Sequence, residues 1–583
     1  EVKGKQRFIE TVRGRGYRFI EDVKRVTVDD AVSGLMMPQT VVPSGRKRVQ
    51  ASSRKHGIGN LATVVSLSEW RHEPEPASAM EPEAVVAPAK VKSTASLFRR
   101  YRLAAVTIVV CIGLGLGGLY WSNVDTSAVP ITSVAVLPFV NFGSDPELEY
   151  FSEGLGENLI DRLSELPQLK VIARSSSFKY REEAPDLQDV ARKLGVQAIV
   201  TGRVMRRGDD LTIRIDLVDA QNDKQLWGEQ FNRKAVDILA LQSEIARTVS
   251  GKLHLKLSGA QESQLARRGT DNPQAYDLLI KGDFFAKKSA TRSKALEYYN
   301  QAVALDPNYS LAHAKVAQTY HNLAADSVLD PKDVMPMVQA AVRRAIELDE
   351  NSADAHFMLA ELAHSSWDWK TAEYEYSRAL ELNPNLVRAH RRYSSLLSDV
   401  GRHDQAIAEA RRVRELDPQQ LVSHLAVPTA LLFARRFDES IVEVKETLEM
   451  GQIYGSYGLL GSAYAGKGMY QEAIAAFKES IRIGGNNSYL KICLGAAYAG
   501  AGKRENAQTV LKQLEGSKEY ISPGELPILY SALGEYDKAF ATLEKAYAAR
   551  DLQLKHLNAE LGFDPLRNDP RFADLVRRVG LPQ

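Results

Sequence analysis

The sequence has 583 residues, of which 25% are charged, and a formal net charge of +2. This length suffices for several domains, and because Cys111 and Cys493 lie far apart, a fold held together by intrachain disulfide bonds is excluded. The small net charge conceals a split. Residues 1–102 hold 19 Lys and Arg against 11 Asp and Glu, about +8, which leaves 56 against 62, about −6, for residues 103–583. The basic part suits a polyanion or an anionic membrane surface, and the acidic part argues against nucleic-acid binding there.

The first residues predict a β-hairpin. Phe8–Val12 and Tyr17–Ile20 are rich in aromatic and β-branched residues, and Arg13–Gly16 supplies glycines for a tight reversal between them. Arginines at the tip and on the second strand concentrate positive charge on this hairpin. Charge alone leaves a DNA contact and an ordinary solvated hairpin equally open.

The stretch IETVRGRGYRF resembles the end of an OmpR/PhoB-type winged-helix DNA-binding domain, whose last hairpin is the wing. Residues 1–25 are therefore expected to be the C-terminal wing of a truncated domain. The resemblance implies that Arg13 enters the minor groove and that Arg15 and Arg18 meet phosphates. Its DNA-binding set here is Arg13, Gly14, Arg15, Gly16, Tyr17 and Arg18. Since the recognition helix of that family is absent, the chain alone is not expected to bind DNA specifically.

Residues 26–100 show no sustained hydrophobic period and contain several prolines, which predicts a flexible cytoplasmic linker. After them, Leu103–Tyr120 carries no charge and predicts a transmembrane helix over residues 101–121, because 18 residues span about 27 Å. Gly113 and Gly117 would allow two such helices to approach closely, so a homodimer is one option.

The flanks of this segment predict its orientation. Lys and Arg cluster on its N-terminal side, whereas SNVDTSAVPITS on the other side has neither. By the positive-inside rule we expect a single pass through a bacterial inner membrane, with the N-terminus cytoplasmic and the C-terminus periplasmic.

Residues 131–233 predict a small α+β domain. Short apolar runs at Val134–Phe139 and Leu169–Ala173 predict strands, a helical period follows Pro146, and Asp186 and Gly195 bound a second helix. Three further strands complete it, and VAVLPF, YFSEGLGENLIDRLS and LGVQAIVTGRV are together similar to a TolB-like domain.

Nothing in this domain predicts catalysis. Ser175–Ser177 has no neighbouring His to complete a Ser-His-acid group, and Gly154 and Gly156 lie within a predicted helix, where packing is a better explanation than phosphate binding. Residues 234–270 are expected to be a connecting helix.

The remaining chain repeats every 34 residues. Segments end at Leu305, Leu348, Leu382, Leu416, Met450 and Ile483, with one insertion of nine residues expected as a longer turn around Asp326–Met337. By period and by resemblance these are tetratricopeptide repeats, about eight over residues 271–551, with a C-terminal cap over residues 552–583. Stacked helix pairs form a solenoid whose concave face suits a protein or peptide partner. The scattered histidines lack helical metal-site spacing, so neither a metal nor an organic cofactor is expected.

The sequence thus predicts a mainly α protein: a tetratricopeptide-repeat solenoid preceded by a small α+β domain, one transmembrane helix and a remnant winged-helix hairpin. This arrangement resembles the ToxR/CadC-like membrane-bound transcription regulators and implies no enzyme activity. Two alternatives stay open: the sensory part of a membrane-bound nucleotide cyclase, and a periplasmic repeat scaffold for protein assembly.

Overall fold

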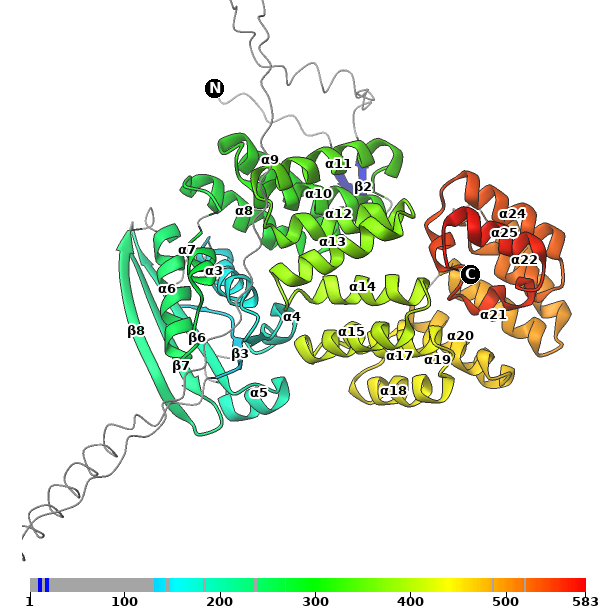
Figure 1. The fold of residues 1–583 in the computed structure, drawn as a ribbon, viewed down its shortest axis with the longest axis horizontal. Coiled ribbons are helices and arrows are strands. Elements are labelled where there is room, and N and C mark those ends of the chain that lie inside the picture. The colour runs from blue at the N-terminus through cyan, green and yellow to red at the C-terminus, as the bar shows by residue number, and fades with distance from the viewer. Residues whose placement is uncertain are drawn as a thin grey trace, which may run out of the picture. The chain divides into compact units, whose positions relative to one another are not determined.

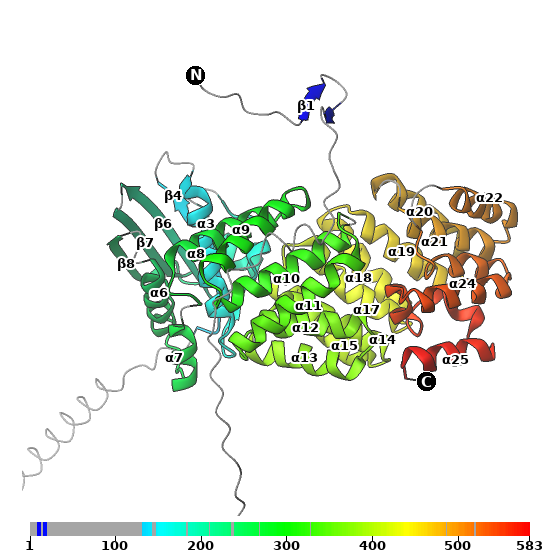
Figure 2. The same cartoon turned by 90° about the horizontal axis from the view of Figure 1, so that it is seen from above.

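The structure is a computed structural model (Figures 1 and 2). It describes residues 9–12, 16–19, 131–142, 147–181, 185–208, 210–234, 238–267, 269–326, 328–484, 487–517 and 521–582. The chain divides into two units, Glu1–Ala105 and Val106–Gln583. Within the described residues no helix combines the length and apolarity that a membrane crossing requires; the predicted span, 101–121, and the linker, 26–100, lie outside them.

The first unit contains the predicted hairpin. Strand β1 (Ile9–Val12) pairs with β2 (Gly16–Phe19) in antiparallel register, with Val12 opposite Gly16 and Ile9 opposite Phe19. Three residues join the strands. The hairpin prediction is therefore confirmed at the level of the backbone.

The second unit opens with a mixed sheet in the order β5-β3-β6-β7-β8. Strand β3 (Ser133–Val136) runs parallel to β5 (Lys170–Val171) and to β6 (Ala198–Arg207). Strands β7 (Asp210–Asp219) and β8 (Lys224–Lys234) continue antiparallel, and the short β4 (Val140–Asn141) also pairs with β6.

Helices cover both faces of this sheet. On one face, α3 (Glu147–Ser164) and α6 (Ile238–Lys252) form a core with alternate strand residues such as Val134 and Val200. On the other, α5 (Leu187–Leu194) packs on Ala135 and Ile199. The alternation follows from the period of two along a strand.

Two details refine the sequence predictions for this domain. Helix α5 begins at Asp186, whose carboxylate accepts from two backbone amides, and ends at Gly195 in the left-handed conformation, both as predicted. The expected connecting helix over residues 234–270 needs correction, because the apolar side of α6 belongs to the core of the α+β domain. The short α7 (Gly259–Ala266) adds Leu265 to the same core.

Eight helix pairs follow, in agreement with the 34-residue period. They are α8 (Pro273–Ala286) with α9 (Arg292–Leu305), α10 (Ser310–Ala325) with α11 (Pro331–Leu348), α12 (Ala353–Ser365) with α13 (Trp369–Leu382), α14 (Val387–Asp399) with α15 (His403–Leu416), α16 and α17 (Leu421–His424, Ala426–Phe433) with α18 (Phe437–Met450), α19 (Tyr454–Gly466) with α20 (Tyr470–Gly484), α21 (Ser488–Gly500) with α22 (Arg504–Glu515), and α23 (Leu526–Ala532) with α24 (Tyr536–Ala548). Small residues such as Ala312, Ala379 and Ala473 are fully buried where paired helices meet.

The nine-residue insertion is mostly helix. Helix α10 has 16 residues against 13 in α12, and α11 has 18 against 14 in α13. The expectation of a longer turn alone is therefore wrong, because the inserted residues extend both helices of that pair.

The turn inside each of the later repeats passes through one residue with positive φ. These residues are Trp367, Gly401, Arg435, Gly468, Gly502 and Gly534. Glycine adopts this conformation without steric cost, whereas Trp and Arg do so only where other contacts hold them.

The two exceptions both contact the C-terminal part of the chain. Trp367 stacks on Tyr547 with ring centroids 5.6 Å apart, and the Arg550 guanidinium lies 4.7 Å from the Trp367 ring centroid. Arg435 pairs with Asp564 through two hydrogen bonds of 2.9 and 2.8 Å. Asp564 belongs to η4 (Leu561–Leu566), which with η3 (Leu552–His556) and α25 (Pro570–Val579) makes up the C-terminal segment.

Candidate functional site

The DNA-binding residues expected from the sequence lie in the hairpin. Gly16, Tyr17 and Arg18 belong to β2, opposite Val12, Thr11 and Glu10. The other three, Arg13, Gly14 and Arg15, lie outside the described residues. The backbone register thus places half of the expected set on one strand and leaves its DNA-binding role a prediction.

A second functional region is the junction between the sheet and the repeats, where Asn385 meets the edge strand β5. The Asn385 amide nitrogen donates to the carbonyl oxygens of Ser164 and Leu169, both at 2.9 Å, and its side-chain oxygen accepts from the Val171 amide at 3.2 Å. One side-chain amide therefore pairs with the edge of a strand as a neighbouring peptide group would. These partners are more than 200 residues apart in sequence.

The next repeat extends this junction (Figure 1). The Asp417 carboxylate accepts hydrogen bonds from the hydroxyls of Ser175 and Ser176 at 2.7 and 2.6 Å, and the Ala173 amide donates to the Leu416 carbonyl at 2.8 Å. These serines belong to the short helix α4 (Arg174–Ser177). The serine run that suggested a nucleophile thus fastens the sheet to the repeats.

Helix α3 presents a row of carboxylates to the first repeats. Glu153, Glu157, Asp161 and Glu165 are spaced by four residues and therefore share one helix face. Glu153 is nearly buried and pairs with Arg174 at 3.2 Å and with Arg181 and Lys287 at 2.5 Å. Burial alone would raise the pKa of Glu153, but Lys287 and Arg181 lower it below its ordinary value.

Asp161 differs from Glu153 in having no direct ion-pair partner among the described residues. It is exposed to water, yet the protein around it raises its pKa to about 7, with Lys315 and Arg388 opposing and Glu157 and Asp283 assisting. Exposure together with a strong effect of surrounding protein is the combination of a side chain in a water-filled recess. Glu165, which is partly buried, also has its pKa raised to about 7, mainly by burial.

The packing explanation of Gly154 and Gly156 is confirmed. A Cβ atom on Gly154 would lie 2.3 Å from Cγ2 of Ile280 in α8, which is closer than real contacts allow. A Cβ on Gly156 would lie 3.3 Å from the Phe178 ring. Both glycines therefore let α3 approach its neighbours.

A third charged group closes the repeats on themselves. Asp399, at the end of α14, is fully buried and accepts from His556 Nδ1 at 2.6 Å and His364 Nε2 at 3.2 Å. Burial would raise the pKa of Asp399, but the two histidines lower it, while burial lowers the pKa of His364. Nearby, Trp369 Nε1 donates to the Val579 carbonyl at 2.9 Å.

Histidines elsewhere have structural roles that follow the repeat. The Nε2 atoms of His313, His356, His390 and His424 each bond the carbonyl oxygen six residues earlier, at 2.8 to 3.1 Å. Their spacing of 43, 34 and 34 matches the repeat period, a signal that was readable in the sequence. Within the described ranges, no three His, Cys, Asp or Glu side chains are grouped so as to hold a metal ion.

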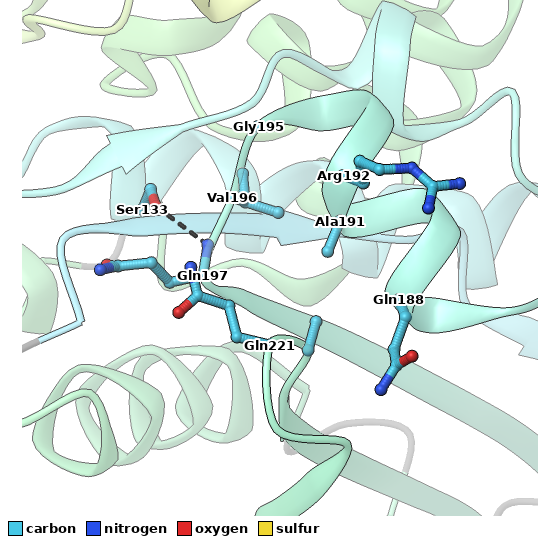
Figure 3. Close-up of a pocket in the computed structure, with 9 residues that line it drawn as sticks. Ser133, Gln188, Ala191, Arg192, Gly195, Val196, Gln197 and Gln221 are labelled. Atoms are coloured by element: carbon cyan, nitrogen blue, oxygen red, sulfur yellow. Dashed lines mark hydrogen bonds between the residues drawn. The ribbon is translucent and has the colours of Figure 1, made fainter.

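A hollow of about 470 Å³ lies where β3 and β6 begin (Figure 3). Ser133 and Gln197 line it, and the Gln197 amide donates to the Ser133 hydroxyl at 3.0 Å. Arg192, its one charged lining residue, pairs with Asp189. Ligands of open α/β sheets bind at the carboxyl ends of parallel strands, so this hollow, at the opposite ends, is a weak candidate.

Comparison with known proteins identifies two parts of the chain. Residues 131–248 match the second domain of the HilA/YgeH-like transcriptional regulators, and residues 454–486 match the tetratricopeptide repeat. The first match ends within α6, in keeping with the core described above.

A curated relative, "Putative adenylate cyclase 3" of Rhizobium meliloti (strain 1021), is 32% identical over 235 residues. The match covers 39% of each protein, so the chain spans well under half the length of this relative.

Among solved structures, a tetratricopeptide repeat protein from Parabacteroides merdae is 14% identical, covering 46% of this chain and 100% of that one, with a TM-score of 0.35. Yeast Tom70 is 15% identical, covering 59% and 82%, with a TM-score of 0.34. Likenesses this weak add no argument about function.

Proposed function

We propose that this chain belongs to a membrane-anchored transcriptional regulator that binds DNA through a cytoplasmic winged helix and receives its signal through the repeats. The observation that carries the proposal is the match of residues 131–248 to the second domain of HilA/YgeH-like transcriptional regulators. The basic hairpin at residues 1–25 supports it independently, since a wing needs a short, positively charged antiparallel pair.

In this proposal the hairpin is an OmpR/PhoB-type wing and residues 131–248 are a TolB-like domain. The 101–121 segment crosses the inner membrane once, which puts residues 1–100 in the cytoplasm and the second unit in the periplasm. The arginine-rich face of α14 supports binding of a protein or peptide partner, because Arg388, Arg391 and Arg392 recur at helical spacing there. The chain itself acts by binding and not by catalysis.

The DNA-binding part is tested by Arg13→Ala in the protein with its complete winged-helix domain. A groove contact is worth about 1 to 3 kcal/mol, so promoter binding should weaken by about ten- to a hundredfold in fluorescence anisotropy. Arg48→Ala, which removes the same charge from the linker, is the control and should change the affinity little. Equal affinities for the two variants would contradict the wing assignment.

The membrane part is tested by reporter fusions. A reporter active only in the periplasm should work when fused after Trp121 and fail when fused after Arg48. Activity at both positions would contradict the proposed orientation, and the cytoplasmic placement of the hairpin with it.

A second candidate is the sensory part of a membrane-bound nucleotide cyclase, favoured by the 32% identity with "Putative adenylate cyclase 3". A periplasmic scaffold is a third arrangement, but no specific observation favours it. Cyclic-nucleotide production by membranes containing the complete protein would support the cyclase. Promoter binding that depends on Arg13 would support the regulator.

A further inference from the structure

The turns that separate successive repeats share one construction. Asn351 and Asn385 are 34 residues apart, and each side-chain oxygen accepts from an arginine of the following helix, Arg378 at 3.0 Å and Arg412 at 3.2 Å. Each backbone amide donates to the side chain two residues earlier, at 3.0 and 3.1 Å.

The histidines beside these turns are equivalent as well. His356 Nδ1 lies 2.5 Å from Glu375, and His390 Nδ1 lies 2.5 Å from Glu409. Their Nε2 atoms bond the carbonyls of Glu350 and Pro384 at 2.9 and 3.0 Å. The two turns therefore present the same groups in the same arrangement.

Their surroundings differ. The Asn385 amide nitrogen bonds two carbonyls of the segment that leads into β5, whereas the Asn351 amide nitrogen donates no hydrogen bond among the described residues. Asn351, Arg378 and His356 line a hollow of about 410 Å³, together with Tyr374, which is 65% exposed. The residue equivalent to Tyr374 in the next repeat is Ala408, so an aromatic surface is added at this turn.

We propose that the hollow at Asn351 binds an extended peptide segment of a partner protein, in the way that the turn at Asn385 holds β5. The Asn351 amide pairs with a carbonyl of that segment and with the N–H two residues later, as Asn385 pairs with Leu169 and Val171. Tyr374 packs against a side chain of the segment. This site lies on the turns between repeats, so it is separate from the inner-face partner proposed above and does not rest on DNA binding.

The second anchoring point of β5 also has an equivalent. The Ala173 amide donates to the Leu416 carbonyl at the end of α15, and Leu382 occupies that position at the end of α13. Carbonyls at a helix C-terminus have no intrahelical partner, so the Leu382 carbonyl is able to accept from the bound segment. Two anchoring points fix both the direction and the register of an extended peptide.

The test uses a fluorescent peptide with the sequence of residues 164–173, SELPQLKVIA, which binds the equivalent turn within the chain. Its anisotropy is measured with the full chain. We expect saturable binding that Asn351→Ala weakens by about tenfold, with loss of one amide pair. Asn308→Ala is the matched control, since Asn308 makes the same contact with Arg344, at 3.2 Å, but does not line the hollow; it should leave binding unchanged.

A second peptide keeps the test independent of protein folding. N-methylation of the valine that corresponds to Val171 removes the N–H and should abolish binding to the unmodified chain. Absence of saturable binding below about 1 mM, or equal binding by the Asn351→Ala variant or the methylated peptide, would overturn the proposal. Self-association of the chain that Asn351→Ala abolishes would identify a second copy as the occupant, and would overturn the assignment to a separate partner.

Discussion

The repeats are held at two places that use different chemistry. At the junction with the sheet, Asn385 bonds the backbone around β5 through a neutral amide. At the closure with the C-terminal segment, the buried Asp399 carboxylate lies between His364 and His556. Both places are built on positions of a repeat that elsewhere have no such contact. Repetition therefore supplies equivalent backbone positions, and single side chains decide which of them become contacts.

The largest effect is expected from breaking the closure. Asp399→Ala removes a buried carboxylate and leaves two buried histidines without their partner, which should cost about 3 kcal/mol in the free energy of unfolding. Urea denaturation followed by tryptophan fluorescence measures it, since Trp367 and Trp369 lie at the closure. Asp404→Ala, at a fully exposed side chain five residues later, should change stability by less than about 0.5 kcal/mol. Similar losses in the two variants would refute the special role of Asp399.

A smaller effect is expected at the junction. Asn385→Ala leaves the Val171 amide and the Leu169 carbonyl without their side-chain partner, which should cost about 2 kcal/mol. Limited proteolysis should then cut near β5 earlier than in the unmodified protein. Asn308→Ala serves as the control, because Asn308 contacts Arg344 but no strand. If both variants were cut at the same rate, the amide would not be what fastens the strand.

The smallest effect, and the one that separates the two places best, is the response to pH. The pKa of His364 is lower in the folded protein than its ordinary value of about 6.5, so the unfolded state takes up the proton first and the closure loses stability as the pH falls through that range. The lowered pKa of Asp399 acts in the same direction at lower pH.

The α3 carboxylates should respond in the opposite sense. Asp161 and Glu165 have pKa values of about 7 in the fold, against about 4 when unfolded, so their contribution is present below pH 4 and lost as the pH rises through 7. Hydrogen exchange at pH 5.5 and 8, corrected for intrinsic rates, should show α3 less protected and η3 more protected at the higher pH. A change in the same direction for both segments would contradict this contrast.

Local signals in the sequence predicted the elements well. Glycines between two β-branched runs predicted the hairpin, Asp186 and Gly195 predicted the ends of α5, and the period of 34 predicted eight repeats. Each of these signals acts over a few residues or recurs at a fixed spacing, so it is visible without the fold.

The contacts that make the second unit functional were not predictable in this way. Asn385 and Val171 are 214 residues apart, and nothing near either residue indicates the other. The role of α6 was missed for the same reason, because its apolar face looks alike whether it covers a sheet or a repeat. The recurrent histidines were detectable by their period, but their carbonyl partners only by the fold.

The contact between Asn385 and β5 also bears on how this protein avoids sticking to copies of itself. Strand β5 is one edge of the sheet, and an uncovered edge is a template for pairing with other chains. The repeats cover it by bonding the Val171 and Ala173 amides. The opposite edge, β8, is instead exposed and carries charged side chains such as Lys224, Glu229 and Lys234. A fragment ending before the repeats would expose β5 without such protection, so the repeats act as a built-in guard against aggregation.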